Sequence, residues 1–420
     1  MTKFDANTWT LQKSMEISTM LPNNKDLTGK SDEERRIIFT DAQKAFEDKW
    51  GLDSNDKNLH ILFIAGDAGG CGFARCELPC KYLNRESGIS AFASVRVVPE
   101  LMIWANAIIW QRQHRDELSN IRDTAAHFGK PQIYEIDDNL HSIPKTNPAY
   151  QAYNKDTKAF HDILNWMKKS DFITVTREAL GEYYKKLTGK EYFVLPNCID
   201  FETFPKVYPN ENKKIRIGWV GSMTHYDDLK VASYGIGKIL EEYKDKVEFV
   251  MMGWDGILRY IDTNKNLIPI SDSLDGIPRE FNKFVDVHNY YQALVDLKLD
   301  IALAPLADNE FNQSGKSPIK WLEYSAAKIP TIVSRVSAYS NYVINGETGL
   351  IAKREANWYY KIKLLIENVD LRKKIAEQAY NEVKNKYSLS MNIHQWANLY
   401  KKSIVDKYQL LNPKINKDGK

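Results

Sequence analysis

The chain has 420 residues, of which 43% are hydrophobic and 27% are charged, and this composition is that of a soluble globular protein. The length exceeds what one core organises, so two domains are expected. The 58 basic side chains outnumber the 55 acidic ones by three, a balance that neither requires nor excludes a nucleic-acid partner. No apolar run approaches the roughly 20 residues of a membrane span, and the first residues lack the apolar core of a signal peptide, so the sequence predicts a cytoplasmic protein.

Residues 1–57 precede the first convincing strand and are predicted to form a helical extension. A helix is expected from Asp32 to Trp50, with Ser31 as its N-cap. The extension is expected to pack on the main body or on another subunit. The sequence assigns it no chemical role.

A glycine-rich turn follows the first buried strand. The apolar run LHILFIA predicts that strand at Leu59–Ala65. After the turn, a helix is expected at Phe73–Leu83, with a kink at Pro79. Such a turn lets backbone N–H groups approach a bound group, and Arg75 is expected to point into a cleft. The glycine spacing differs from the dinucleotide fingerprint Gly-x-Gly-x-x-Gly, which disfavours a dehydrogenase.

Strands and helices then alternate, as in a doubly wound parallel sheet. The predicted strands are 94–98, 107–110, 132–136, 172–175 and 192–195, and the predicted helices are 116–128, 156–169 and 178–187. Functional groups in such sheets gather at the carboxyl ends of strands. Arg112, Asp137, Asp138 and His141 lie at or just past those ends. Helix capping or turn formation is the structural alternative for the two aspartates.

A second alternating block follows a proline-containing linker at 201–212. Its first strand, Ile215–Val220, ends in Gly221-Ser222, a turn suited to a phosphate, with His225 close by. Further strands are expected at 247–252 and 284–285, a helix at 290–297, and a hairpin or loop at 346–352. Helices are expected from residue 357 onward, the last strongly periodic one at 391–406.

Three of the four cysteines, at positions 71, 76 and 80, form a local cluster. Their spacing matches no standard zinc pattern, and no histidine is near them in sequence. We therefore predict that Cys76 and Cys80 are small packed residues on a helix, and no metal site is predicted.

The stretch 300–334 contains the strongest chemical pattern. An apolar run predicts a strand at 301–306, and Ser317-Pro318 are typical of the start of a helix. Lys316 and Lys320 flank the N-terminus of that helix, where free N–H groups favour an anion, and Glu323 lies one turn further on. Two cations for phosphates and one acceptor for ribose hydroxyls suit a nucleoside diphosphate. An amphipathic helix with solvated lysines fits these residues equally well.

The predicted architecture is α/β, with two Rossmann-like doubly wound domains facing each other across a cleft. We place the first domain at 58–205, completed by a C-terminal helix within 389–420, and the second at 206–388.

Several segments, taken together, resemble the GT-B glycosyltransferases, specifically the retaining family four, or glycosyltransferase group 1. In the second half they are LPNCID (195–200), IRIGWVGSMTHYDDL (215–229), LDIALAPLADNEFNQSGKSPIKWLEYSAAKIPTIVS (299–334) and GETGL (346–350). In the first half they are GDAGGCGFAR (66–75), YEIDDNL (134–140) and SDFITVTREAL (170–180).

The resemblance implies roles for individual residues. Glu323 matches the second acid of the family's Glu-(seven residues)-Glu motif, which holds the ribose, and Lys316 and Lys320 match the cations near the diphosphate. The remaining donor-binding residues expected are Gly69, Gly70, Gly72, Arg75, Gly221, Ser222, His225 and Ser317. No bound metal or cofactor is implied, and a nucleoside-diphosphate sugar, a UDP-sugar first, is the expected co-substrate.

One departure concerns the first acid of that motif, which falls on Gly315. Asp308 or Glu310 in the same loop is expected to substitute for it, or the donor sugar is held differently.

The function that the resemblance implies is transfer of a sugar, with retention, to a hydroxyl of a glycan or envelope acceptor. Lys316 and Lys320 would stabilise the leaving diphosphate, and Asp137, Asp138 and His141 would position the acceptor. One alternative acceptor is a hydroxymethylated pyrimidine in DNA, suggested by the paired lysines at 168–169, 185–186 and 213–214. Another alternative is a sugar-nucleotide-binding module without activity, because of Gly315. Donor sugar, acceptor and oligomeric state stay open.

Overall fold

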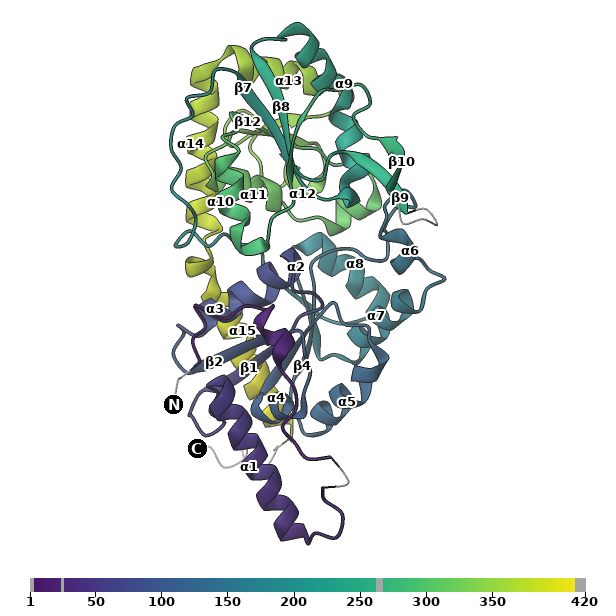
Figure 1. Cartoon of the computed structure of the whole chain (residues 1–420), viewed down its shortest axis with the longest axis vertical. Helices are drawn as coiled ribbons and strands as arrows, with labels where there is room; N and C mark the ends of the chain where they lie inside the picture. The colour runs from purple at the N-terminus through teal and green to yellow at the C-terminus, as the bar shows by residue number, and fades with distance from the viewer. Residues whose placement is uncertain (1–3, 24–25, 262–266, 412–420) are drawn as a thin grey trace.

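The computed structural model describes residues 4–23, 26–261 and 267–411. Figure 1 shows two lobes stacked along the long axis, the N-terminal half below and most of the C-terminal half above. The last helix, α15 (Leu389–Leu411), leaves the upper lobe and returns to the lower one. Its Trp396 and Tyr400 are buried against the lower lobe, so the end of the chain completes the core of the first lobe.

The lower lobe contains a six-stranded parallel sheet in the order β2-β1-β3-β4-β5-β6. Alternate residues of β1 enter different cores: Leu62 and Ile64 lie on one face, Ile61 and Phe63 on the other. Both faces are therefore covered, as parallel sheets require. The strands are β1 (Leu59–Ile64), β2 (Ile89–Ser94), β3 (Ala107–Gln111), β4 (Gln132–Ile136), β5 (Phe172–Val175) and β6 (Tyr192–Val194). The helices are α2 (Gly70–Gly72), α3 (Leu78–Leu83), α4 (Pro99–Trp104), α5 (Ser119–His127), α6 (Tyr150–Tyr153), α7 (Lys158–Lys169) and α8 (Glu178–Thr188).

Two predictions in this lobe need correction. The strand expected at 94–98 lies earlier, because the side chain of Ser94 bonds the backbone of Arg96 and turns the chain there. The helix expected at 73–83 is not a single α-helix. It begins as a π-helical turn, Phe73–Glu77, and continues as α3, which contains Pro79. Proline has no N–H for the carbonyl four residues back, and the wider turn shifts the hydrogen-bond pattern by one residue.

The upper lobe contains a second six-stranded parallel sheet in the order β11-β8-β7-β12-β13-β14. Counted within the lobe, this is the 3-2-1-4-5-6 order of the Rossmann fold. The strands are β7 (Ile215–Val220), β8 (Val247–Gly253), β11 (Glu280–Lys283), β12 (Ile301–Ala304), β13 (Thr331–Ser334) and β14 (Leu350–Ala352). The helices are α9 (Tyr226–Glu242), α10 (Tyr290–Asp296), α11 (Ile319–Ala326), α12 (Ser337–Ser340), α13 (Glu355–Glu367) and α14 (Val369–Lys386). Both sheets confirm the predicted fold class.

Three elements of the upper lobe differ from expectation. The expected hairpin or loop at 346–352 contains β14, an edge strand parallel to β13. Strand β11 ends just before the predicted strand at 284–285. An antiparallel pair, β9 (Ile257–Ile261) and β10 (Leu267–Asp272), was not predicted at all. All four strands lie at the edge of a sheet, where the long apolar run of a central strand is not required.

The N-terminal extension packs on the lower lobe. Its helix α1 (Asp32–Trp50) begins with a capping box between Ser31 and Glu34, which confirms the predicted helix and cap. The indole N–H of Trp9 donates to the Ala93 carbonyl at 2.8 Å. In the described part of the chain, no helix combines the length and the hydrophobicity needed to cross a membrane.

Candidate functional site in the interdomain cleft

A cleft with a volume of about 420 Å³ lies between the two lobes. It is lined by residues that follow β1 and β4 in the lower sheet and β7 and β12 in the upper sheet. The strand order reverses beside β1 and beside β7, and ligands of open α/β sheets bind at such points, outside the carboxyl ends of the strands. The cleft is therefore the candidate active site.

Lys320, in the first turn of α11, is the most strongly desolvated cation of the upper wall. Its side chain is 91% buried, and its ammonium group donates to the Val220 carbonyl at 2.6 Å. Burial, together with the nearby charge of Lys316, lowers the pKa of Lys320 to about 8, although Glu323 acts in the opposite direction. An anion that enters the cleft would restore the charge of this lysine and gain attraction from it.

Glu323 lies one turn further along α11 and also faces the cleft. Tyr290, the first residue of α10, donates a hydrogen bond to its Oε2 at 2.8 Å. Burial raises the pKa of Glu323 to about 7, and Lys320 and Tyr290 limit that rise. Among the described residues, Tyr290 is the hydrogen-bond partner of this carboxylate and occupies one of its oxygens, so the group has acceptor capacity left for ligand hydroxyls.

Lys316 connects the two walls. Its Nζ forms an ion pair with Asp138 Oδ2 of the lower lobe at 2.9 Å and lies over the ring of Phe311. Burial alone would lower the pKa of Lys316, but the charges of Asp138 and Asp228 raise it. In this structure Asp138 is therefore the counter-ion of a lysine on the opposite lobe.

Asn197, at the end of the lower sheet, makes a second bridge between the lobes. Its side chain donates to Ser317 Oγ at 2.8 Å and accepts from Arg75 Nη1 at 3.0 Å. Ser317 was predicted as an N-cap, but its side chain makes no capping bond, and Pro318 occupies the cap position. The sequence analysis did not assign Asn197 to the site, although it lies within the quoted LPNCID segment.

Arg75 is almost completely buried in the lower wall. Its Nε pairs with Glu135 at 2.8 Å, and its guanidinium group lies 4.7 Å from the ring centre of Trp396. Among the described residues, Nη2 has no hydrogen-bond partner, and Arg75 lines the cleft. The site thus holds one donor N–H group that no protein acceptor satisfies.

Asp137 presents the complementary acceptor. Arg112 pairs with its Oδ1 at 3.5 Å, but within the described residues that oxygen accepts no hydrogen bond. Burial alone would raise the pKa of Asp137. The charges of Arg112 and Arg75 and a hydrogen bond with Cys71 outweigh burial and lower the pKa, so the group is a carboxylate. Arg112 has a φ of 52°, a left-handed backbone that costs energy in a residue with a side chain, and its Nη1 donates to Cys71 Sγ at 3.0 Å.

The turn after β7 positions the remaining upper-wall groups. Ser222 and His225 both line the cleft. His225 Nδ1 lies 2.7 Å from Asp228 Oδ2, and burial with the nearby Lys320 charge lowers the pKa of His225 to about 4. A Cβ on Gly221 would lie 2.5 Å from the Trp219 ring and 3.0 Å from Lys320 Nζ, so only glycine lets that lysine approach the strand end.

The glycine turn after β1 is only partly available to a ligand. Gly70 lines the cleft, whereas the N–H groups of Gly69 and Gly72 already donate to Asp67 Oδ1 at 2.8 and 3.3 Å. A Cβ on Gly72 would lie 2.0 Å from the Asp67 carbonyl oxygen. Gly72 therefore serves the packing of the turn.

Other candidates lie away from the cleft. His141 bonds Tyr184 and the Phe160 carbonyl at 3.0 and 2.8 Å, and burial lowers its pKa to about 4, so it packs inside the lower lobe. Asp308 and Glu310, expected as substitutes for the missing acid, are exposed and do not line the cleft. Cys76 and Cys80 are buried in the core, as predicted.

Gly315 lies close against the backbone of the lower lobe. A Cβ at this position would lie 2.7 Å from the backbone nitrogen of Asn139 and 2.8 Å from its Cβ. A glutamate side chain cannot begin there unless the lobes separate. The departure from the family motif therefore has a steric cause in this structure.

Comparison with known proteins agrees with this geometry. Residues 200–382 match the family described as "Glycosyl transferases group 1". That match covers most of the upper lobe. An uncharacterized glycosyltransferase of Methanocaldococcus jannaschii is 21% identical over 259 residues, which are 56% of this chain. The chain spans 60% of the length of that curated relative.

Solved structures share the fold across both lobes. Sucrose-phosphate synthase from Thermosynechococcus elongatus superposes with a TM-score of 0.58 at 12% identity, over 83% of this chain and all of that one. Anabaena HepE in complex with UDP-glucose superposes with a TM-score of 0.55 at 11% identity, over 82% of this chain and all of that one. These likenesses identify the fold as GT-B.

Proposed function

We propose that the protein is a glycosyltransferase that moves a sugar from a UDP-sugar to a hydroxyl of a glycan or cell-envelope acceptor, with retained configuration. The observation that carries the proposal is the cluster of Lys316, Lys320 and Glu323 at one end of α11, buried in the cleft. Lys320 is desolvated and, among the described residues, forms no ion pair with a carboxylate, although Glu323 is near it; a diphosphate is a ligand that compensates its charge. HepE, which shares the fold, binds UDP-glucose, and this supports uridine as the base.

The upper wall would hold the donor. Breaking the bond between the sugar and the diphosphate builds negative charge on the leaving oxygen. Lys320 and the N-terminus of α11 would stabilise that charge in a site with little water. Lys316 would join them once the diphosphate replaces Asp138 as its partner, and Glu323 would accept hydrogen bonds from the ribose.

The lower wall would hold the acceptor. Asp137 has an oxygen without a hydrogen bond, and Arg75 has an N–H without one. A hydroxyl donates and accepts, so it satisfies both groups. We propose that Asp137 accepts the hydrogen bond of the acceptor hydroxyl and orients it before the reaction. As the hydroxyl oxygen bonds to the anomeric carbon, the bond from that carbon to the diphosphate breaks, and the hydroxyl proton passes from its hydrogen bond with Asp137 to the leaving diphosphate oxygen. Retention itself rests on the family resemblance.

The described residues give DNA less support as the acceptor. Lys169 pairs with Asp123 at 3.0 Å and Lys185 pairs with Glu191 at 2.9 Å, so one lysine in each of two lysine pairs already has a carboxylate neighbour.

The test is a binding and turnover experiment. Thermal shift and calorimetry with UDP, UDP-glucose and other nucleoside-diphosphate sugars should show selective stabilisation by one uridine conjugate, followed by release of UDP when acceptors are added. Binding without release of UDP, with or without added glycans, would instead identify a sugar-nucleotide-binding module. The absence of binding by every conjugate would contradict the donor site.

A further inference from the structure

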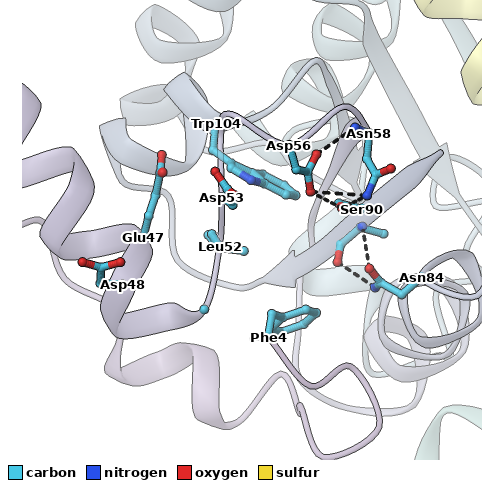
Figure 2. A pocket seen from close by; sticks show the side chains of 12 residues that line it. Phe4, Glu47, Asp48, Leu52, Asp53, Asp56, Asn58, Asn84, Ser90 and Trp104 are labelled. Carbon is cyan, nitrogen blue, oxygen red and sulfur yellow. Dashed lines mark hydrogen bonds between the residues drawn. The ribbon is translucent and has the colours of Figure 1, made fainter. Parts of the chain in front are cut away.

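A second cavity, of about 320 Å³, lies on the lower lobe where the N-terminal extension meets the sheet. Figure 2 shows the 12 residues that line it. Phe4 and residues 47–53 come from the extension, whereas Ser90, Ala91 and Trp104 come from β2 and α4. Neither part forms the cavity alone, and its volume falls within the range of about 300–1,000 Å³ typical of small-molecule sites.

The cavity is remote from the cleft. Asn58, at the start of β1, lines the cavity, and Asp67, just past the end of β1, lines the cleft. Six residues of extended strand separate the two, a distance of about 20 Å. The cavity therefore cannot be a subsite of the donor.

Four carboxylates and no basic side chain line the cavity. Two of them are satisfied by the protein: Glu47 accepts from Gln43 at 2.6 Å, and Asp56 accepts from His60 at 2.8 Å. The other two have spare capacity. Asp53 uses one oxygen for the N–H of Asn55, and among the described residues Asp48 has no hydrogen-bond or ion-pair partner. This charge repels phosphates and other anions, in contrast to the cleft.

Trp104 adds an independent requirement for a ligand. Its side chain is 98% buried and lines the cavity, yet within the described part of the chain its indole N–H has no acceptor. A buried donor without a partner is unfavourable, and a bound acceptor would relieve that cost. The ring is held in place by stacking on His60, with 4.6 Å between ring centres, so the N–H cannot turn away to another partner.

We propose that this cavity binds a neutral saccharide unit. Its free groups are carboxylate acceptors at Asp48 and Asp53 and one donor at Trp104. A sugar hydroxyl both donates and accepts, so it satisfies both kinds, whereas an ammonium group has donors only. Half-buried Phe4 and buried Leu52 supply the apolar surface that the C–H face of a pyranose requires.

The assignment gives the extension a role. It completes a sugar site whose other half belongs to the acceptor-side lobe. If the protein glycosylates a glycan, as proposed above, the site anchors that acceptor about 20 Å from the reacting hydroxyl. Saccharide binding itself does not depend on that function.

The test is ligand-observed NMR of the full chain with methyl glucoside, methyl galactoside, methyl mannoside and N-acetylglucosamine, with putrescine as a cationic probe. Saturating UDP keeps the cleft occupied. Sugars are titrated to about 50 mM, because a small open site gives millimolar affinity. The double variant Asp48→Asn/Asp53→Asn should weaken binding about tenfold, as should Trp104→Phe, whereas Glu117→Gln, at an exposed acid outside the cavity, should not.

Saccharide binding that persists with UDP and is lost in the double variant supports the proposal. The double variant keeps it testable if Trp104→Phe fails to fold, since both aspartates are exposed. Displacement of the sugar by UDP, no binding of any sugar, or binding of putrescine alone would each overturn it. Failure of UDP itself to bind would count against the proposed donor site. The loss of saccharide binding in the double variant would still test the cavity, because that comparison does not depend on UDP.

Discussion

The two walls of the cleft differ in how far opposite charges within the protein neutralise their charged side chains. On the upper wall, Lys320 and Glu323 are desolvated. Burial lowers the pKa of Lys320 to about 8 and raises the pKa of Glu323 to about 7, so it favours the neutral form of each group. On the lower wall, Arg75 is paired with Glu135 and Arg112 with Asp137. The upper wall is therefore incomplete without an anion, whereas the lower wall is nearly neutral and complete except for two hydrogen bonds.

This difference supports the proposed assignment of the donor to the upper wall and the acceptor to the lower wall. A desolvated cation gains most from a phosphate, and a neutral wall with one free acceptor and one free donor gains most from a hydroxyl. The ion pair between Lys316 and Asp138 is the one charge pair that joins the two walls directly among the described cleft residues. Variants on each wall should therefore fail in different ways.

The largest effect is expected from Lys320→Met, which removes the charge and keeps the packing. Turnover of the UDP-sugar should fall by about 10²–10³-fold, because the leaving diphosphate loses a desolvated cation. The thermal midpoint should hardly fall, since a buried charge is removed. Steady-state kinetics and a melting curve check both. Lys328→Met, two residues beyond the other end of this helix and outside the cleft, is the control, and equal losses in both variants would contradict the assignment.

Asp137→Asn tests the lower wall. We expect turnover to fall about 100-fold with the affinity for UDP unchanged, because the acceptor hydroxyl loses its anionic partner. Calorimetry with UDP separates binding from transfer.

Asp138→Asn is the natural comparison for Asp137→Asn, since the two carboxylates are adjacent and face different partners. It frees Lys316 from a competing carboxylate, so UDP should bind about threefold more tightly with a smaller change in turnover. If the two variants show the same turnover and the same affinity for UDP, the assignment of donor and acceptor to different walls is wrong.

Glu323→Gln should weaken UDP binding about tenfold, and its pH profile tests the pKa values directly. In the unliganded protein the carboxylate of Glu323 forms as the pH rises through about 7, and the charge of Lys320 is lost as the pH rises through about 8. UDP affinity should therefore be highest between these values and fall on both sides. The variant should lose the fall on the acid side only; a profile identical to that of the wild type would contradict the role of Glu323.

The sequence identified the upper wall because that wall is local. Lys316, Lys320 and Glu323 lie within eight residues, in α11 or just before it, so the local path of the chain brings them together. The fold class was equally accessible, since the alternation of apolar strands and helices is a local signal.

The lower wall was not accessible in the same way. The carboxylate of Asp137 was found from its position at a strand end, but its partner Arg112 and its separation from Asp138 depend on packing between distant segments. The same holds for Asn197, which joins Arg75 to Ser317 over more than a hundred residues of chain. Gly315 was identified as a departure from the family motif, but only the opposing backbone of Asn139 explains it.

The smallest effect concerns a contact at the edge of the cleft that joins three parts of the chain. His288 of the upper lobe lies 2.6 Å from Glu77 of the lower lobe, whose other oxygen accepts the N–H of Leu11 in the extension. Burial lowers the pKa of His288, but hydrogen bonds with Glu77 and Asp286 outweigh it, and the net shift is upward. A raised folded pKa means that this contact stabilises fully below the unfolded value of about 6.5 and is lost as the pH rises through the folded value.

His288→Asn should therefore lower the thermal midpoint by about 1–2 °C at pH 6 and leave it unchanged at pH 9, because an ion pair with one partly exposed member contributes little. Melting curves at the two pH values measure the difference. The substitution should leave UDP affinity intact, since His288 does not line the cleft. An equal loss of stability at both pH values would show that packing of the ring, and not its charge, holds the walls together at this edge.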